Sequence, residues 1–303
     1  MAELTPIGDL IQVNDYRLHV YQLGEGNPTV VFVSGAGNDC LVWQLTQPEV
    51  ARFTSTLSYD RAGLGWSDAT ENPRSSEFIA SELHDLLSKS NTKPPYVMVG
   101  HSMGGVYIRK YAEIYPDTVA GMVLIDSPHE ELNGRLPQRV QEADRAQEQA
   151  RIGQMRQMLE LMDRMEHSEY VEYFKAPPDQ PQPFPDDVVA LRRDRVRPKA
   201  IRAMIREVEA METNTSQHWD RKAILGTKPV TILIAEETQV SPTLTDEENH
   251  LAGTIVKETQ QELLILSENS RAITVSDSSH FIQVDQPQIV IDTIRELVDQ
   301  LKV

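Results

Sequence analysis

Residues 100–105 read Gly-His-Ser-Met-Gly-Gly and join an apolar run at 96–99 to a predicted helix at 104–115. A serine flanked by glycines at a strand-to-helix turn is typical of a nucleophile elbow. Only small residues fit at Gly100 and Gly104, because the chain reverses direction sharply there. The turn lifts the Ser102 hydroxyl off the sheet, and the first N–H groups of the helix point toward the same place. This stretch therefore predicts that Ser102 is a nucleophile.

Strand and helix patterns alternate on both sides of this turn. The run TVVFV at 29–33 predicts a buried strand that opens into a loop, Ser-Gly-Ala-Gly, at 34–37. Further strands are predicted at 53–59, 122–125 and 230–235, and helices at 75–88 and 251–264. Alternation of this kind favours an α/β fold, a mostly parallel sheet with helices on both faces.

Strand patterns are absent from a long middle segment of the sequence. Residues 128–222 have mostly helical patterns, so we predict a core domain of residues 1–127 and 223–303 with a helical insertion at 128–222. Methionines at 155, 158, 162 and 165 share one face of a predicted helix in this insertion. Because methionine adapts to irregular shapes, this stripe is interpreted either as a pocket wall or as packing between the insertion and the core.

The loop at 34–37 and the serine turn together predict an oxyanion hole. The N–H of Ala36 would pair with the N–H of Met103, the residue directly after the nucleophile. Both would stabilise the negative oxygen of a tetrahedral intermediate. Taken alone, the glycine loop is better explained as a turn that only redirects the chain.

A general base is predicted near the end of the chain. His280 closes the polar run Ser-Asp-Ser-Ser-His at 276–280, just past the last predicted strand. Loops at the carboxyl edge of a parallel sheet are where such folds build their sites. The imidazole of His280 would take the proton of Ser102 and return it to the leaving group.

These motifs, taken in order along the chain, resemble the α/β-hydrolase family. The resemblance rests on the loop at 34–37, the stretch YDRAGLGWS at 59–67, the turn at 100–105, and His280 followed by Asp-Gln-Pro at 285–287. It implies an eight-stranded, mostly parallel sheet and a serine–histidine–acid triad. It also implies a helical cap inserted after the sixth strand, where the segment at 128–222 lies.

The acid of the triad is where the sequence departs from the family pattern. Most members carry an aspartate just after the seventh strand, where this sequence has Gln239. A glutamine cannot carry the charge that stabilises an imidazolium. Three alternatives stay open: the neighbouring pair Glu236 and Glu237, Asp246 further along the chain, or Asp126 at the end of the sixth predicted strand.

Asp126 is the favoured acid. It follows Ser102 by 24 residues, a spacing similar to that of haloalkane dehalogenases that carry their acid after the sixth strand. An unpaired carboxylate at the end of a buried strand would also be costly. An aspartate at this position can instead cap the following turn.

The predicted function is hydrolysis of small to medium carboxylic esters through an acyl-enzyme on Ser102. The alternatives are a lactonase or carbon–carbon bond hydrolase that uses the same triad, or a ligand-binding or signalling relative without catalysis. The resemblance disfavours dehalogenase and epoxide hydrolase chemistry, because those members have an aspartate where this chain has Ser102.

The composition of the chain limits the kinds of molecule that it is expected to bind. The net charge of −17 disfavours binding to nucleic acid or to an acidic membrane surface. We expect neither a signal peptide nor a stable membrane insertion, and the single cysteine, Cys40, excludes an intrachain disulfide. No sequence motif for a metal or cofactor is present, so none is expected. We therefore expect a cytoplasmic enzyme with a small-molecule ester as its partner, and a homodimer stays an open option.

Overall fold

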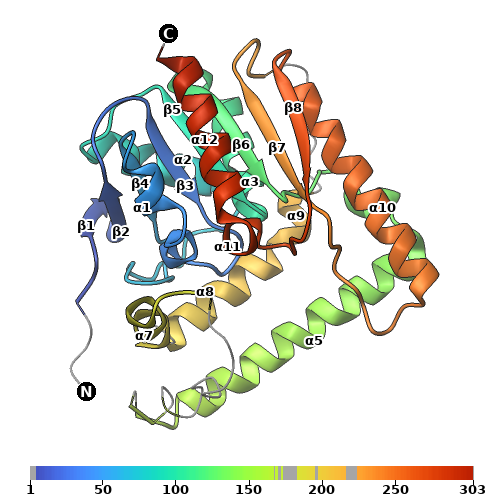
Figure 1. Ribbon diagram of the computed structural model, residues 1–303. Coiled ribbons are helices and arrows are strands. Elements are labelled where there is room, and N and C mark those ends of the chain that lie inside the picture. Colours follow the sequence, from blue (N-terminus) through green and yellow to red (C-terminus); the bar gives the residue numbers. More distant parts are fainter. Residues whose placement is uncertain are drawn as a thin grey trace.

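The computed structural model describes residues 5–166, 168–169, 172, 183–194, 197–215 and 224–302. An eight-stranded sheet forms its centre, with helices on both faces (Figure 1). Across the sheet the strands are β1 (Asp9–Val13), β2 (Tyr16–Leu23), β4 (Thr56–Tyr59), β3 (Thr29–Val33), β5 (Tyr96–His101), β6 (Val119–Ile125), β7 (Val230–Ala235) and β8 (Ser270–Val275). Neighbouring strands from β4 to β8 are parallel, whereas β2 pairs antiparallel with both β1 and β4. The predicted eight-stranded, mostly parallel α/β sheet is confirmed.

The central strands are apolar throughout because both of their faces are buried. All five residues of β3 are buried. Val31 and Val33 join the core formed with α2 (Ser76–Lys89) and α3 (Met103–Ile114). Val30 and Phe32 join the opposite core, which includes residues of α1 (Gln47–Val50) and α12 (Pro287–Leu301). Successive side chains of a strand point to opposite faces, so one short segment contributes to both cores.

The start of one helix differs from the prediction. The helix predicted at 251–264 is α10 (Asp246–Glu262), followed by the short 3-10 helix η3 (Leu263–Leu266). It begins five residues earlier than predicted, because Thr245 and Glu248 form a capping box across the first turn. Asp246 lies in that first turn, and the N-cap itself is Thr245.

Between β6 and β7 the described chain is helical, and we call these elements the β6–β7 helices. They are α4 (Leu132–Arg135), α5 (Gln138–Met162), α7 (Asp186–Asp194), α8 (Pro198–Glu209) and α9 (Met211–Thr215). Figure 1 shows α8 between the sheet and α5. The end of the predicted insertion, at residue 222, lies outside the described residues.

The methionine stripe packs within the β6–β7 helices. Met155 and Met162 of α5 share an apolar cluster with Ile201, Ile205 and Val208 of α8. The stripe therefore joins two helices of the same segment, which differs from the predicted packing between the insertion and the core. Although α5 has 25 residues, neither it nor another described helix is apolar enough over a sufficient length to cross a membrane.

Candidate active site

Ser102 lies in the tight turn between β5 and α3. Its backbone has φ 52° and ψ −125°, a combination that residues with a side chain rarely adopt. Its N–H donates to the carbonyl oxygen of Ile125 at 2.9 Å. A Cβ on Gly100 would lie 2.6 Å from backbone atoms of Gly104, and a Cβ on Gly104 would lie 2.0 Å from the carbonyl oxygen of Val33. The flanking residues must therefore be glycines, because backbone segments meet closely on both sides of the serine.

His280 and Asp126 form a hydrogen-bonded pair from two different loops. His280 lies just after β8, and Asp126 lies directly after β6. The distance from His280 Nδ1 to Asp126 Oδ2 is 2.7 Å. The side chains keep exposures of 24% and 13%. The pair is thus shielded from bulk solvent but still accessible, which suits a group that exchanges protons with a substrate.

His101 connects this pair to the serine turn. Its Nε2 lies 2.8 Å from the carbonyl oxygen of His280, so Nε2 carries the proton and donates it. Burial, and then the neighbouring imidazole of His280, lower the pKa of His101 to about 3. His101 is therefore neutral at neutral pH. Because it directly precedes Ser102, its hydrogen bond holds the backbone of His280 beside the serine turn.

The carboxylate of Asp126 uses both of its oxygens. Oδ1 accepts hydrogen bonds from the Ala235 N–H at 3.2 Å and from Nε2 of Gln260 at 3.0 Å, while Oδ2 faces His280. Burial raises the pKa of Asp126, but the hydrogen bonds from His280, Gln260 and Ala235 outweigh that effect and hold the pKa below its usual value. Asp126 is thus kept as an anion with a defined orientation.

The sequence analysis missed Gln260. It lies on α10, 134 residues beyond the carboxylate that it contacts. Because α10 is rich in polar residues, a further glutamine on it gives no local signal of a partner in a distant loop.

The alternative acids lie elsewhere. Glu236 and Glu237 are exposed. A carboxylate oxygen of Glu236 accepts the N–H of Asp277 at 3.2 Å, and Asp246 lies in the first turn of α10. Within the described ranges, no carboxylate other than Asp126 hydrogen-bonds to the ring of His280.

The loop at 34–37 lies against the serine turn. A Cβ on Gly35 would lie 3.1 Å from Cβ of Ser102 and 3.0 Å from Nδ1 of His101. Met103 is the first residue of α3, so its N–H has no acceptor within the helix. None of the residues that the structure describes accepts a hydrogen bond from the Ala36 N–H. The structure therefore brings both predicted oxyanion donors to the neighbourhood of Ser102.

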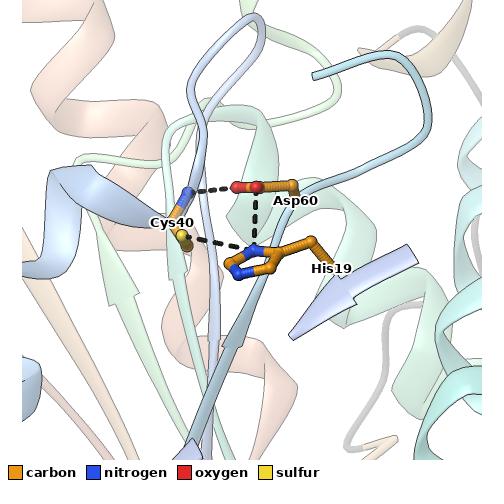
Figure 2. A group of neighbouring side chains, drawn as sticks. All are labelled: His19, Cys40 and Asp60. Atoms are coloured by element: carbon orange, nitrogen blue, oxygen red, sulfur yellow. Dashed lines mark hydrogen bonds and ion pairs between the residues drawn. The ribbon is translucent and has the colours of Figure 1, made fainter. Parts of the chain in front are cut away.

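A second polar cluster is buried in the core. His19, Cys40 and Asp60 are fully buried, and their potential metal-ligating atoms lie within 4.8 Å of one another (Figure 2). The sequence offers no motif for this group, because the three residues come from separate elements. The carboxylate of Asp60 accepts the N–H of Cys40 at 2.8 Å and the N–H of Trp66 at 3.0 Å, and it lies 2.9 Å from Nδ1 of His19. These bonds support a role for Asp60 in holding the loop that follows β4.

Comparison with known proteins agrees with the fold. The model of the "Alpha/beta hydrolase family" matches residues 30–293. The epoxide hydrolase CorEH is 20% identical, with a TM-score of 0.70 over 97% of this chain and 98% of that chain. Est816, described as an N-acyl homoserine lactone degrading enzyme, is 18% identical, with a TM-score of 0.66 over 95% and 99% of the two chains. A thermophilic esterase from Thermogutta terrifontis is 20% identical, with a TM-score of 0.64 over 97% and 99%.

Several curated relatives match only part of this chain. Three relatives are 28% to 32% identical to this chain over 106 to 136 residues, and the matches cover only 20% to 42% of their lengths. The family match covers most of the chain and includes the serine turn and strands β4 to β8, whereas β1 and β2 precede it. The chain therefore belongs to the alpha/beta hydrolase family.

Proposed function

We propose that the chain is a serine hydrolase that cleaves small to medium carboxylic esters. The observation that carries this proposal is the hydrogen bond between His280 and Asp126 beside the strained turn of Ser102. Structural neighbours include an epoxide hydrolase as well as an esterase. The serine at position 102 favours acyl transfer for this chain, because a hydroxyl needs an adjacent base and His280 can supply one.

The first half of the reaction forms an acyl-enzyme. Nδ1 of His280 faces the carboxylate of Asp126, which leaves Nε2 to accept the proton of Ser102. The Ser102 oxygen then attacks the ester carbonyl. The N–H groups of Ala36 and Met103 stabilise the negative oxygen of the tetrahedral intermediate. As the intermediate collapses, His280 protonates the leaving alcohol and Ser102 keeps the acyl group.

The second half repeats these steps with water. His280 removes a proton from a water molecule, and the resulting hydroxide attacks the acyl-enzyme. Asp126 stabilises the imidazolium that forms in both halves, and it does not need to take up the proton itself. Collapse of the second intermediate releases the carboxylic acid and returns the proton to Ser102.

We also propose that the segment at 128–222 is a cap that covers this site. Contacts of α8 with the core support the proposal. A Cβ on Gly37, in the loop at 34–37 that we call the oxyanion loop, would lie 2.6 Å from Met204. A Cβ on Gly63 would lie 2.6 Å from Ala203. A substrate would then bind between α8 and the sheet edge, on the side of α8 that carries Ala203 and Met204.

The test is hydrolysis of p-nitrophenyl esters from acetate to palmitate by the wild type and by Ser102→Ala. Ser88→Ala is a matched control, because Ser88 is exposed on α2. We expect Ser102→Ala to lose at least about a thousandfold in kcat and the control to match the wild type. The chain-length optimum then reports the size of the acyl pocket.

The same experiment includes a γ-lactone and an epoxide. Preferred opening of the lactone by a Ser102-dependent route would redirect the proposal to a lactonase. Epoxide hydrolysis that survives Ser102→Ala would overturn the serine mechanism. A folded wild-type protein without activity on any of these compounds would instead support the binding-protein alternative.

A further inference from the structure

The polar groups of the oxyanion loop are held by a buried arginine from outside the proposed triad. Arg61 is 1% exposed and lies in the loop after β4. Its Nη1 donates to the carbonyl oxygen of Ser34 at 2.6 Å, and its Nη2 donates to that of Gly35 at 2.7 Å. Two consecutive carbonyls are thus held by one planar group. Because the peptide units are rigid, this contact also sets the direction of the Ala36 N–H.

The partner of this arginine comes from the β6–β7 helices. Glu207 of α8 is fully buried, and its carboxylate pairs with Arg61 through two hydrogen bonds of 2.7 Å, from Nε and from Nη2. The same carboxylate accepts the N–H of Gly37 at 2.8 Å. One side chain of α8 therefore contacts the oxyanion loop both directly and through Arg61. These contacts lie on both sides of Ala36 in the sequence.

The loop that carries Arg61 is itself anchored. Asp60, the preceding residue, bonds to the N–H groups of Cys40 and Trp66 and faces His19 (Figure 2). A Cβ on Gly65 would lie 2.0 Å from the Asp60 carboxylate, so the turn around it has no spare room. The backbone of Arg61 is therefore held in place by the contacts of its neighbour. Its guanidinium has a defined position, in which it binds both the oxyanion loop and Glu207.

A structural role alone explains this arrangement poorly. Burying an ion pair stabilises a fold little in comparison with apolar packing of the same volume, because both charges lose their hydration. It does, however, define geometry strongly, since the planar guanidinium and carboxylate bind through directional hydrogen bonds. Geometry is also what an oxyanion hole requires, because its donors must lie within hydrogen-bond distance of the developing charge.

We propose that Arg61 and Glu207 are positioning residues through which docking of α8 on the core orients the oxyanion loop. When α8 is docked, the carbonyls of Ser34 and Gly35 and the N–H of Gly37 are all bound, and the Ala36 N–H remains to receive the substrate oxygen. When Glu207 is withdrawn, Gly37 loses its acceptor and Arg61 loses its counter-charge. The catalytic part of this proposal rests on the proposed function, whereas the ordering of the loop does not.

The kinetic test compares Glu207→Gln with the wild type and with Glu209→Gln. Glutamine keeps the size of the side chain and one acceptor oxygen but loses the charge. Glu209 is the matched control, because it lies two residues away on α8 and pairs with Arg156 at an exposed position. Activity is normalised to the active sites that a fluorophosphonate labels at Ser102.

For Glu207→Gln we expect kcat per labelled site to fall about 10- to 100-fold while KM changes little. The control should match the wild type. An unchanged kcat per site, with only fewer active sites, would show a purely structural role and overturn the proposal. Arg61→Lys serves if Glu207→Gln does not fold, because lysine keeps the charge but cannot bind two carbonyls and a carboxylate in one plane.

Hydrogen exchange supplies the readout that does not depend on catalysis. The amides of residues 34–39 should exchange at least about tenfold faster in Glu207→Gln than in the wild type or Glu209→Gln. Equal exchange in all three proteins would overturn the ordering of the loop. If the wild type neither hydrolyses esters nor reacts with the fluorophosphonate, the proposed function fails, and the exchange result still decides whether Glu207 orders the loop.

Discussion

The carboxylate of Asp126 lies 2.7 Å from Nδ1 of His280, although the two residues are 154 positions apart in the chain. They follow β6 and β8, which are separated in the sheet by β7. Parallel strands place their carboxyl ends at one edge, so the loops after β6 and β8 can meet there. The end of β7 takes part as well, because the Ala235 N–H donates to Asp126. An acid after β6 can therefore serve a histidine after β8 without any carboxylate after β7.

The first prediction concerns the identity of the acid. Asp126→Asn should lower kcat by about 10⁴-fold, because asparagine keeps the shape but neither stabilises the imidazolium nor selects the correct tautomer. Steady-state kinetics on the best p-nitrophenyl ester, with circular dichroism to check the fold, measures this. Glu236→Gln and Glu237→Gln are controls and should stay within about twofold of the wild type. An Asp126→Asn enzyme that retains more than a tenth of wild-type kcat would exclude this residue as the acid.

The second prediction concerns Gln260, which donates to Asp126. Gln260→Ala should lower kcat about tenfold, because a hydrogen bond to a charged group contributes about 1.5–3 kcal/mol. That bond lowers the pKa of Asp126, so its loss should raise this pKa, and activity should fall at a higher pH than in the wild type as the solution is acidified. A profile of kcat/KM from pH 3 to 9 measures the shift. Gln261→Ala, at the exposed neighbouring position, should leave the profile unchanged.

The third prediction concerns how the stabilisation of the fold by Glu207 depends on pH. Burial raises the pKa of Glu207, but Arg61 outweighs that effect and holds the pKa below its usual value. Such a carboxylate stabilises the fold above its unfolded pKa of about 4.3, and the contribution disappears as the pH falls through the lower folded pKa. The wild type should therefore exceed Glu207→Gln in unfolding free energy by about 3–5 kcal/mol at pH 7.

Urea denaturation at pH 7, 5, 4 and 3 measures this difference in unfolding free energy. The difference should shrink once the pH drops below the pKa of Glu207 in the unfolded chain. Glu209→Gln should show a small difference at every pH, because its ion pair is exposed. A Glu207→Gln difference that stays constant down to pH 3 would argue against a charged Glu207 in the folded state.

The fourth prediction concerns two glycines, one in a crowded site and one in an open site. Gly104→Ala should destabilise the protein by about 3 kcal/mol or more, because the new Cβ would meet the backbone oxygen of Val33 at 2.0 Å. Gly153→Ala on α5 should stabilise it by about 0.5–1 kcal/mol, because alanine favours the helix and, among the described residues, no atom outside the local helix backbone lies within 4 Å of the new Cβ. Thermal denaturation of both variants tests the pair. A Gly104→Ala protein as stable as the wild type would contradict the close approach of the turn to β3.

Local patterns in the sequence were enough to predict the architecture and the serine turn. Continuous apolar runs such as the one at 29–33 identify strands buried on both faces, and the glycines around Ser102 are required by local backbone geometry. Both signals lie within a few neighbouring residues, which is why they can be read without a structure. Even the helix start that the prediction missed was encoded locally, since Thr245 and Glu248 are three residues apart.

The contacts between distant side chains became known only from the folded arrangement. The sequence favoured Asp126 as the acid but left Glu236, Glu237 and Asp246 open, because spacing along the chain does not reveal which loop end reaches His280. Gln260 could not be predicted, and neither could the pairing of Glu207 with Arg61, 146 residues apart. These contacts depend on how helices dock on a finished sheet. Docking depends on packing between distant segments, and no short stretch of sequence records that packing.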